Sequence, residues 1–349
     1  MSEQAIVILA LALLFMVLMF LPFLPGVVEL FHPRDDKPLV IKLAHAKEAR
    51  YFGQSFRTRM EVALPEPTPG QHQVLLSKAE LVTVTDDLNM GPSQGLPTIT
   101  WVRGNLTLGA ACNILQEVLI EGHARLAADV SIRAVACNSD FSAGPNLTIM
   151  RWLDVDGDAR IGASSSLGQS CTTGGRLELH PGTTFQHLFG APVCVGDFGG
   201  ASPLIGLREQ TPRPPDMNIR KITDVAYRTR SFVLADGEVA DFDVISTHNV
   251  IIGENAQVLG SIKARGPVII KTGAIVTGSV FSESNITLEM DSRVLKNVFS
   301  QERIELMGGA IVGQPLAVCS VVARDCLTLH AMSAVFGYLC TDGEGVISL

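Results

Sequence analysis

Aromatic residues are scarce in this chain of 349 residues: Phe, Trp and Tyr together make up only 6%. Because large aromatic side chains dominate conventional cores, their scarcity favours a thin core filled by stacked aliphatic side chains. Glycine is plentiful by contrast, with 32 residues, which suits a chain that turns at frequent corners. The composition therefore favours a repetitive solenoid over an ordinary globular domain.

Basic residues are not in excess: 27 Lys and Arg stand against 35 Asp and Glu, for a net charge of −8. This balance argues against a general nucleic-acid binder. The 7 cysteines are an odd number without a C-x-x-C pair, which favours a reducing compartment over a disulfide framework. No G-x-S-x-G or P-loop motif is present. We therefore expect no catalytic residue, no cofactor and no enzymatic activity.

The stretch from 250 to 345 repeats at a fixed spacing of 18 residues. Apolar blocks begin at Val250, Val268, Ile286 and Ile304, and a fifth begins at Leu327 after an insertion of five residues. The third residue of each of the first four blocks is followed six residues later by a valine: Val258, Val276, Val294 and Val312. Each unit thus consists of three six-residue sides with alternate residues inward, which is strand geometry. This predicts an all-β fold, a three-sided β-helix with coils of about 18 residues.

The same six-residue phase extends through the first half of the chain, with one slip between 142 and 146. Inward pairs begin at Leu106/Leu108 and end at Thr183/Phe185. The phase is lost from 199 to 230, a segment rich in Pro and Arg. We therefore expect five parts: a transmembrane anchor (1–31), a basic juxtamembrane segment with leading strands (32–97), a first β-helical array (98–197), a linker or lateral excursion (198–230) and a second array (231–349).

Ala5 to Leu24 is a run of twenty residues without a charge, which is the length that crosses a bilayer as a helix. A cleaved signal peptide is the alternative, but no Lys or Arg precedes the run and no A-x-A site follows it. Seven basic residues follow between 34 and 59, so the positive-inside rule places the large C-terminal part in the cytoplasm. Residues 39–64 are loosely helical and could lie on an anionic leaflet or form a solvated connection.

Other candidate sites have simpler explanations. Asp154 to Asp158 resembles the start of a calcium loop, but the glycine comes fourth and Ser165 stands where a twelfth-position Glu is needed. The acids are better explained as outward residues at a coil corner. The histidines share no metal-ligand spacing, so we expect no metal site. Three N-x-T sequons are explained by an Asn in left-handed geometry at a coil corner; they begin at Asn105, Asn146 and Asn285.

The second array resembles the bactofilins, polymer-forming bacterial cytoskeletal proteins. The resemblance rests on the phrases Val258–Ala264 and Val276–Ser282, together with Val268–Ile270 and Ile304–Leu306. It covers roughly residues 231 to 349 and, more loosely, 98 to 197. It implies a right-handed β-helix that polymerises end to end, without nucleotide, into nonpolar filaments that act as membrane-associated scaffolds. This chain departs from the family pattern in its apolar N-terminal span, its second array and its long interruption.

Self-association also follows from the physics of the fold, because the end of a β-helix exposes strand edges and an apolar cross-section. The sequence stops while still in strand character, so we expect contacts between copies at Leu339, Val346, Ile347 and Leu349. The expected function is a scaffold anchored in the bacterial inner membrane, which organises envelope-building or cell-shape machinery. Its expected partners are the membrane, further copies of the chain and envelope-synthesis proteins, with no nucleic acid.

Two other functions remain open from the sequence. A hexapeptide-repeat acyltransferase also has three six-residue sides, and His248 at the corner 247–249 is its best candidate base. An extracytoplasmic polysaccharide-binding β-helix is the second, although coils of constant length leave little room for a groove.

Overall fold

The computed structural model describes residues 3–23, 48–63, 72–76, 80–196, 219–220 and 226–349. Its contacts divide the chain into one unit up to Glu48 and a second unit from Ala49 to Leu349. The first unit contains helix α1 (Glu3–Phe20) and the short 3-10 helix η1 (Leu21–Phe23), where every residue from 10 to 21 is exposed. No helix in the described part of the chain is both long and apolar enough to span a bilayer. Leu24, the expected end of the span, lies outside the described residues.

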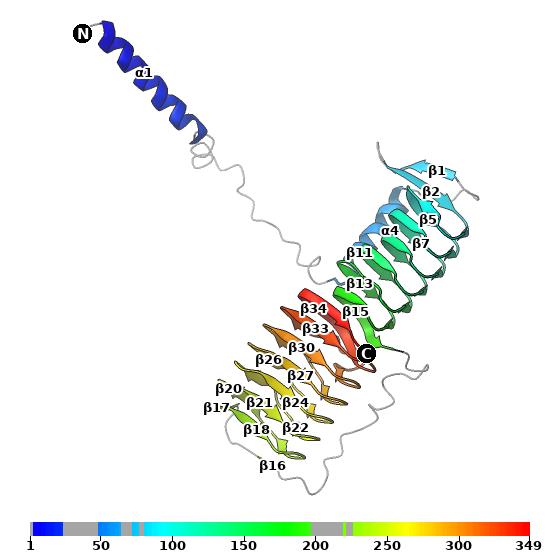
Figure 1. Cartoon of the computed structure of the whole chain (residues 1–349), viewed down its shortest axis with the longest axis vertical. Coiled ribbons are helices and arrows are strands. Elements are labelled where there is room, and N and C mark those ends of the chain that lie inside the picture. The colour runs from blue at the N-terminus through cyan, green and yellow to red at the C-terminus, as the bar shows by residue number, and fades with distance from the viewer. Residues whose placement is uncertain (1–2, 24–47, 64–71, 77–79, 197–218, 221–225) are drawn as a thin grey trace. The chain divides into compact units, whose positions relative to one another are not determined.

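The second unit is a β-solenoid (Figure 1). It has about 13 turns. One helix, α4 (Tyr51–Ala63), accompanies it. The strands of the first array and its leading hairpin are β1 (His72–Leu75), β2 (Leu81–Thr85), β3 (Leu88–Met90), β4 (Gly95–Leu96), β5 (Ile99–Val102), β6 (Leu106–Leu108), β7 (Asn113–Ile120), β8 (Ala124–Leu126), β9 (Ser131–Cys137), β10 (Phe141–Ala143), β11 (Thr148–Val155), β12 (Ala159–Ile161), β13 (Ser170–Thr173), β14 (Leu177–Leu179) and β15 (Thr184–Val195).

The strands of the second array are short until its last turn. They are β16 (Ile219–Arg220), β17 (Ala226–Thr229), β18 (Phe232–Leu234), β19 (Val239–Ala240), β20 (Asp243–Ser246), β21 (Val250–Ile252), β22 (Gln257–Val258), β23 (Ile262–Ala264), β24 (Val268–Ile270), β25 (Ile275–Val276), β26 (Val280–Ser282), β27 (Ile286–Leu288), β28 (Arg293–Val294), β29 (Val298–Ser300), β30 (Arg303–Leu306), β31 (Ile311–Val312), β32 (Cys319–Ala323), β33 (Cys326–Leu329) and β34 (Ala334–Ile347).

Parallel pairing between successive repeats builds both arrays. In the second array each repeat contributes three strands, and from β18 to β28 each strand pairs with its counterpart 18 residues later, as β21, β22 and β23 do with β24, β25 and β26. Their inward side chains are buried and their outward ones are partly exposed, as in β24, where Val268 and Ile270 flank the outward Ile269. The predicted solenoid is therefore confirmed. The inward pairs expected from Leu106/Leu108 to Thr183/Phe185 are also all buried.

One corner of each coil lies in left-handed backbone geometry. In the second array these corners are Gly237, Asn255, Gly273, Asp291, Gly309 and Met332, and in the first array Ser93, Ala111, Asp129, Asn146, Ser164 and Gly182. Glycine takes this geometry without steric cost, and Asn and Asp tolerate it. Of the three sequon asparagines, only Asn146 lies at such a corner. The side chain of Asn105 instead accepts a hydrogen bond from the backbone nitrogen of His123, at 2.9 Å.

The first array begins earlier than expected. Strand β2 pairs in parallel with β5, and β3 and β4 pair with β6 and β7, so the predicted leading strands form a coil of the array itself. Strand β1 pairs antiparallel with β2, as the predicted leading strand pair required. Helix α4 lies within the segment predicted to be loosely helical, and it packs on strands β9 and β11 of this array.

The two arrays meet at their C-terminal ends. The last strand of the first array, β15, pairs antiparallel with the last strand of the second, β34. In Figure 1 these two strands, green and red, lie side by side, and the coils of each array continue away from them in opposite directions. The chain therefore completes the first array at the junction, begins the second at its far end, and returns to the junction. Residues 197–218 and 221–225 lie outside the described residues, and strands β16 and β17, which fall within the predicted linker or excursion 198–230, already pair as part of the second array.

Candidate functional site

The residues predicted to mediate self-association lie at the junction inside the chain. Leu339 is opposite Leu188 and Val346 is opposite Thr184 in the antiparallel β15–β34 pair. The side chains of Leu339 and Ile347 are each only 1% exposed, whereas Leu349 is 89% exposed. The first array of the same molecule therefore already covers the end of the second array. A further copy cannot pair with that end unless the junction opens.

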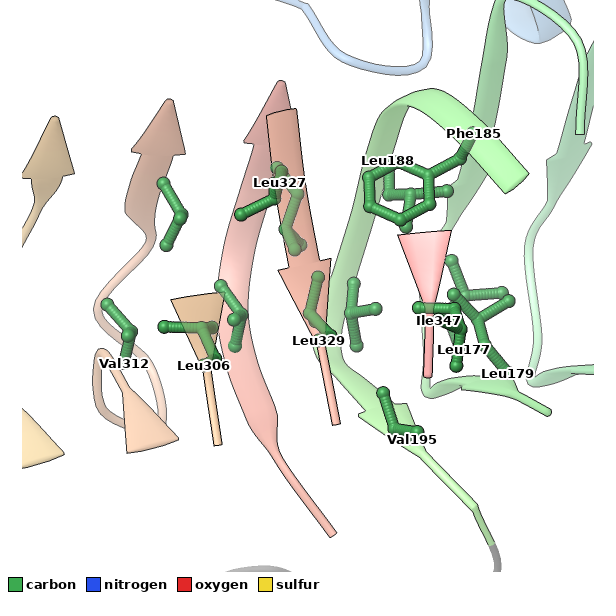
Figure 2. Close-up of a cluster of buried hydrophobic side chains, with 14 of the residues drawn as sticks. Leu177, Leu179, Phe185, Leu188, Val195, Leu306, Val312, Leu327, Leu329 and Ile347 are labelled. Atoms are coloured by element: carbon green, nitrogen blue, oxygen red, sulfur yellow. The ribbon is translucent and has the colours of Figure 1, made fainter. Parts of the chain in front are cut away.

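The core is continuous across this junction. Figure 2 shows Leu177, Phe185 and Leu188 of the first array close to Leu327, Leu329 and Ile347 of the second. All of these side chains are buried in one hydrophobic cluster that extends through both arrays. The apolar cross-sections that would otherwise face water at two solenoid ends are thus buried against each other.

The backbone edges at the junction are also satisfied. The nitrogen of Gly182 donates to the carbonyl of Ile347 at 2.8 Å, and the nitrogen of Ile347 donates to that of Thr183 at 2.9 Å. On the far side, the nitrogen of Met332 donates to the carbonyl of Val195 at 2.9 Å. Because unpaired strand edges are what template further pairing, this end of each array does not present such an edge.

Close contacts fix the register of the junction. The rings of Phe189 and Tyr338 lie with centroids 4.7 Å apart. A Cβ atom on Gly345 would come within 2.4 Å of the Phe185 ring, so only glycine fits at this position without displacement. The junction therefore has the specific packing of a protein core.

We expect the junction to lose stability as pH rises through the neutral range. A hydrogen bond with Cys340, in the opposing strand, raises the pKa of His187 more than burial lowers it. A raised pKa means that the protonated ring stabilises the fold. This contribution is complete below the ordinary histidine pKa of about 6.5 and is lost as pH rises through the higher folded value.

Urea midpoints measured from pH 5.5 to 8.5 test this, and His187→Gln should remove part of the decline. His248→Gln is the control, because His248 lies at an exposed corner where its Nδ1 is 3.1 Å from the Thr247 hydroxyl. Equal pH profiles for the wild type and His187→Gln would show that the ring makes no such contribution.

The outer end of the first array differs from the junction. Strands β3 and β4 each have a single strand partner within the described part of the chain, namely β6 and β7. Their inward side chains, Leu88, Met90 and Leu96, are only partly buried. The residues that follow them one coil further in are fully buried: Leu106, Leu108 and Ile114 are each at most 1% exposed. This end therefore has both features that a stacking surface needs, an open edge and apolar side chains.

Helix α4 is held on the side of the first array by an ion-pair cluster. Asp154, whose side chain is 2% exposed, accepts hydrogen bonds from Arg50 Nε at 2.9 Å and Nη2 at 2.7 Å, and it also pairs with Arg57. Thr172 donates a further hydrogen bond to Asp154, at 2.6 Å. Burial lowers the pKa of Arg50, but the hydrogen bonds and charges of Asp154 and Asp156 outweigh it and raise that pKa above its usual range.

The cluster accounts for the acidic segment that resembled a calcium loop. Its first two acids, Asp154 and Asp156, pair with arginines of the α4 segment. Asp154 points outward from the solenoid core as expected, but it lies beneath α4 and not at an open corner. Within the described residues, no group of three or more His, Cys, Asp and Glu side chains is arranged to hold a metal ion.

Apolar contacts complete the docking of α4. Met60 is fully buried, and Phe56 meets Trp152 edge to face with ring centroids 5.7 Å apart. They join a second hydrophobic cluster on the outside of the solenoid with Leu119 and Ala136. Residues 39–64 are predicted to lie on a leaflet or to form a solvated connection, whereas α4 docks on the array; the outward apolar residues of the array are the sequence signal of this docking.

Most of the cysteines lie in the solenoid core. All seven are unbridged, and five of them are buried: Cys112, Cys137, Cys171, Cys194 and Cys319. Burial raises the pKa of Cys137 to about 11 and that of Cys194 and Cys319 to about 12. Because the thiolate is the reactive form, these thiols are poor nucleophiles near neutral pH.

Comparison with known proteins gives no match to a family model, to a curated protein or to a solved structure.

Proposed function

We propose that this protein is a structural scaffold whose solenoid associates with further copies through the outer end of the first array. The observation that carries the proposal is the contrast between the two kinds of end. The C-terminal ends of both arrays are sealed against each other, whereas Leu88, Met90 and Leu96 remain partly exposed beside strands with a single partner.

The polarity of the arrays supports a two-fold contact. Because the arrays meet at their C-terminal ends, the outer end of the first array is N-terminal. Two copies that meet there place the same surface against itself, which makes an isologous contact. Such a contact reverses the direction of the solenoid, as the β15–β34 junction does within one chain. This contact alone closes at two copies, so the nonpolar filaments that the bactofilin resemblance implies would require a second contact elsewhere on the solenoid.

The rest of the proposal rests on the sequence patterns described above. The solenoid is three-sided and, by the bactofilin resemblance, right-handed. The apolar segment from Ala5 to Leu24 attaches the protein to the bacterial inner membrane, with the solenoid on the cytoplasmic side. The scaffold organises envelope-building or cell-shape machinery and is not an enzyme. Buried thiols with raised pKa values and arginine-paired acids support a structural role over catalysis.

Replacing Met90 with Lys tests the assembly surface. A charge placed in the contact must lose its hydration, so we expect Met90→Lys to convert assembled species to single molecules. Met150→Lys is the matched control, because Met150 lies on the lateral face of the same array and is 49% exposed.

The measurement is sedimentation velocity together with electron microscopy of the full chain in mild detergent. Unfolding midpoints are recorded alongside, so that lost assembly is distinguished from lost folding. If Met90→Lys and Met150→Lys sediment like the wild type, the outer end of the first array is not the contact.

A further inference from the structure

An open cleft of about 550 Å³ lies beside helix α4, a volume typical of small-ligand sites. One wall is the helix, with Phe52 and Arg59. The opposite wall is made of outward side chains on the first array, among them Glu117, Arg133 and Arg151. Trp152, which also packs against Phe56, lines the same cleft. The docking of α4 therefore creates a concave surface that the regular coils alone would not provide.

The two arginines on the array wall have more positive charge than their surroundings neutralise. Arg133 Nε and Arg151 Nη1 approach the same oxygen, Glu117 Oε1, at 3.3 and 3.2 Å. Among the described residues, Arg133 also donates a long hydrogen bond of 3.4 Å to Gln116. Two cations thus share one carboxylate, although each guanidinium has five N–H donors. Both side chains remain accessible, at 38% and 48% exposure.

The arginines of the α4 docking cluster provide the contrast. Arg57 donates to Asn138 at 2.7 Å and to the carbonyl of Cys137 at 2.9 Å, in addition to pairing with Asp154 and Asp156. Its side chain is only 11% exposed. That cluster is saturated and holds the helix. The Arg133–Arg151 pair is accessible and lines the cleft, and its printed partners among the described residues leave guanidinium donors available, as at a binding site.

We propose that this cleft binds a monocarboxylate that carries a ring, with the carboxylate held by Arg133 and Arg151. Guanidinium groups bind carboxylates and phosphates through paired hydrogen bonds. One net positive charge on the trio with Glu117 matches a monoanion, and the nearby glutamate disfavours a dianion such as phosphate. Phe52, 51% exposed at the rim, offers an apolar face to the ring.

An extended acidic peptide fits the cleft less well. The strands whose residues line its floor, β5, β7, β9 and β11, already have strand partners on both sides. They have no open edge to which a peptide could add as a strand. Recognition must therefore come from side chains, including the hydroxyl of Ser55 and the amide of Gln116.

Tryptophan fluorescence of the full chain tests the proposal. The protein has 2 tryptophans, so Trp101→Phe leaves Trp152 in the cleft as the reporter. In this background, glucuronate and benzoate represent a sugar ring and an aromatic ring, while acetate and inorganic phosphate lack either the ring or the single charge. We expect saturable quenching by at least one of the two ring acids, and weaker binding of acetate and phosphate.

Variants assign the contacts. Arg133→Gln and Arg151→Gln should each weaken binding roughly tenfold to a hundredfold, as expected for a lost charged hydrogen bond. Arg265→Gln is the matched control, because Arg265 is 71% exposed, lies in the second array and pairs with Glu283. Phe52→Ala should weaken the ring acids more than acetate.

No saturable quenching by either ring acid would overturn the proposal, as would equal binding by phosphate or equal losses in Arg265→Gln and Arg151→Gln. The readout does not depend on self-association, so it stands apart from the assembly test.

Discussion

Asp154→Ala is expected to release helix α4 from the solenoid. The substitution leaves Arg50 and Arg57 without their shared buried partner, although their side chains are only 19% and 11% exposed. Removing one member of a buried ion pair costs about 3–5 kcal/mol, because the remaining charge stays desolvated. The apolar docking of Phe56 and Met60 contributes about 1.5–3 kcal/mol for each side chain. The free energy lost with the Asp154 carboxylate is comparable with the free energy that apolar docking contributes. The docked state should therefore no longer predominate.

Release of α4 should also unfold it. The helix has 13 residues, and isolated helices of this length are marginal in water. The inward ladders of the array do not depend on α4, so strand content should be retained. We expect red-shifted Trp152 emission, lower helical circular dichroism and proteolysis within residues 51–63, at an unchanged strand signal.

Asp156→Ala is the control for this experiment. Its carboxylate contacts the same two arginines, but its side chain is 42% exposed. Exposed ion pairs contribute only about 0–1 kcal/mol, so α4 should remain docked. Asp154→Asn keeps hydrogen-bond acceptors and loses the charge, and should be intermediate. Equal effects of Asp154→Ala and Asp156→Ala would contradict the central role of Asp154.

The solenoid could be predicted from the sequence because its inward positions alternate at a fixed period. Burial of a strand's inward face requires apolar side chains at every second residue, and the 18-residue repeat places them in register from coil to coil. Val268 and Ile270 illustrate this, since the same positions one coil earlier and one coil later are also buried.

Strands beneath α4 depart from that alternation, and the sequence shows the departure without showing its cause. In Val118–Ile120 and Ala134–Cys137, apolar residues occupy the inward and outward positions alike. Such runs are typical of strands buried on both faces. They indicate that something covers the array, but they do not identify the cover. The partner contributes only Phe56 and Met60 from a short basic helix, and Arg50 and Arg57 resemble surface charges until Asp154 is placed beneath them.

The junction could not be predicted from periodicity at all. A repeat pattern shows how each coil packs on the next, but it does not show what packs on the last coil. Strands β15 and β34 are the longest, at 12 and 14 residues, yet nothing in their sequences requires antiparallel pairing across some 150 positions. The sequence therefore predicts a second copy at the C-terminal edge, whereas the chain's own first array occupies it.

Leu339→Lys is expected to open this junction. Leu339 is 1% exposed and faces Leu188, so a lysine there loses the apolar contact, about 1.5–3 kcal/mol, and must also give up its charge or its burial. A buried lysine commonly has its pKa lowered by several units, and each unit corresponds to 1.36 kcal/mol. The total approaches the stability of a typical domain, roughly 5–15 kcal/mol. Separating the two array ends costs less than keeping the lysine buried, since each array retains its own strand pairing.

Hydrogen exchange measures the opening directly. The amides of Gly182, Met332 and Ile347 donate across or beside the junction and should be protected in the wild type. In Leu339→Lys they should exchange rapidly, while amides in β24 and β27 keep their protection. Leu349→Lys is the matched control, because Leu349 is 89% exposed and its replacement should leave the junction closed.

The same pair of variants separates an internal junction from an assembly surface. If Leu339 contacted a second copy, Leu339→Lys would reduce sedimentation of assembled species and leave exchange in the single molecule unchanged. If it seals the chain's own arrays, the junction amides lose protection at every protein concentration. The opened ends then expose apolar cross-sections, so aggregation should increase with concentration. Protection that is equal in the two variants would show that the β15–β34 pair does not hold the arrays together.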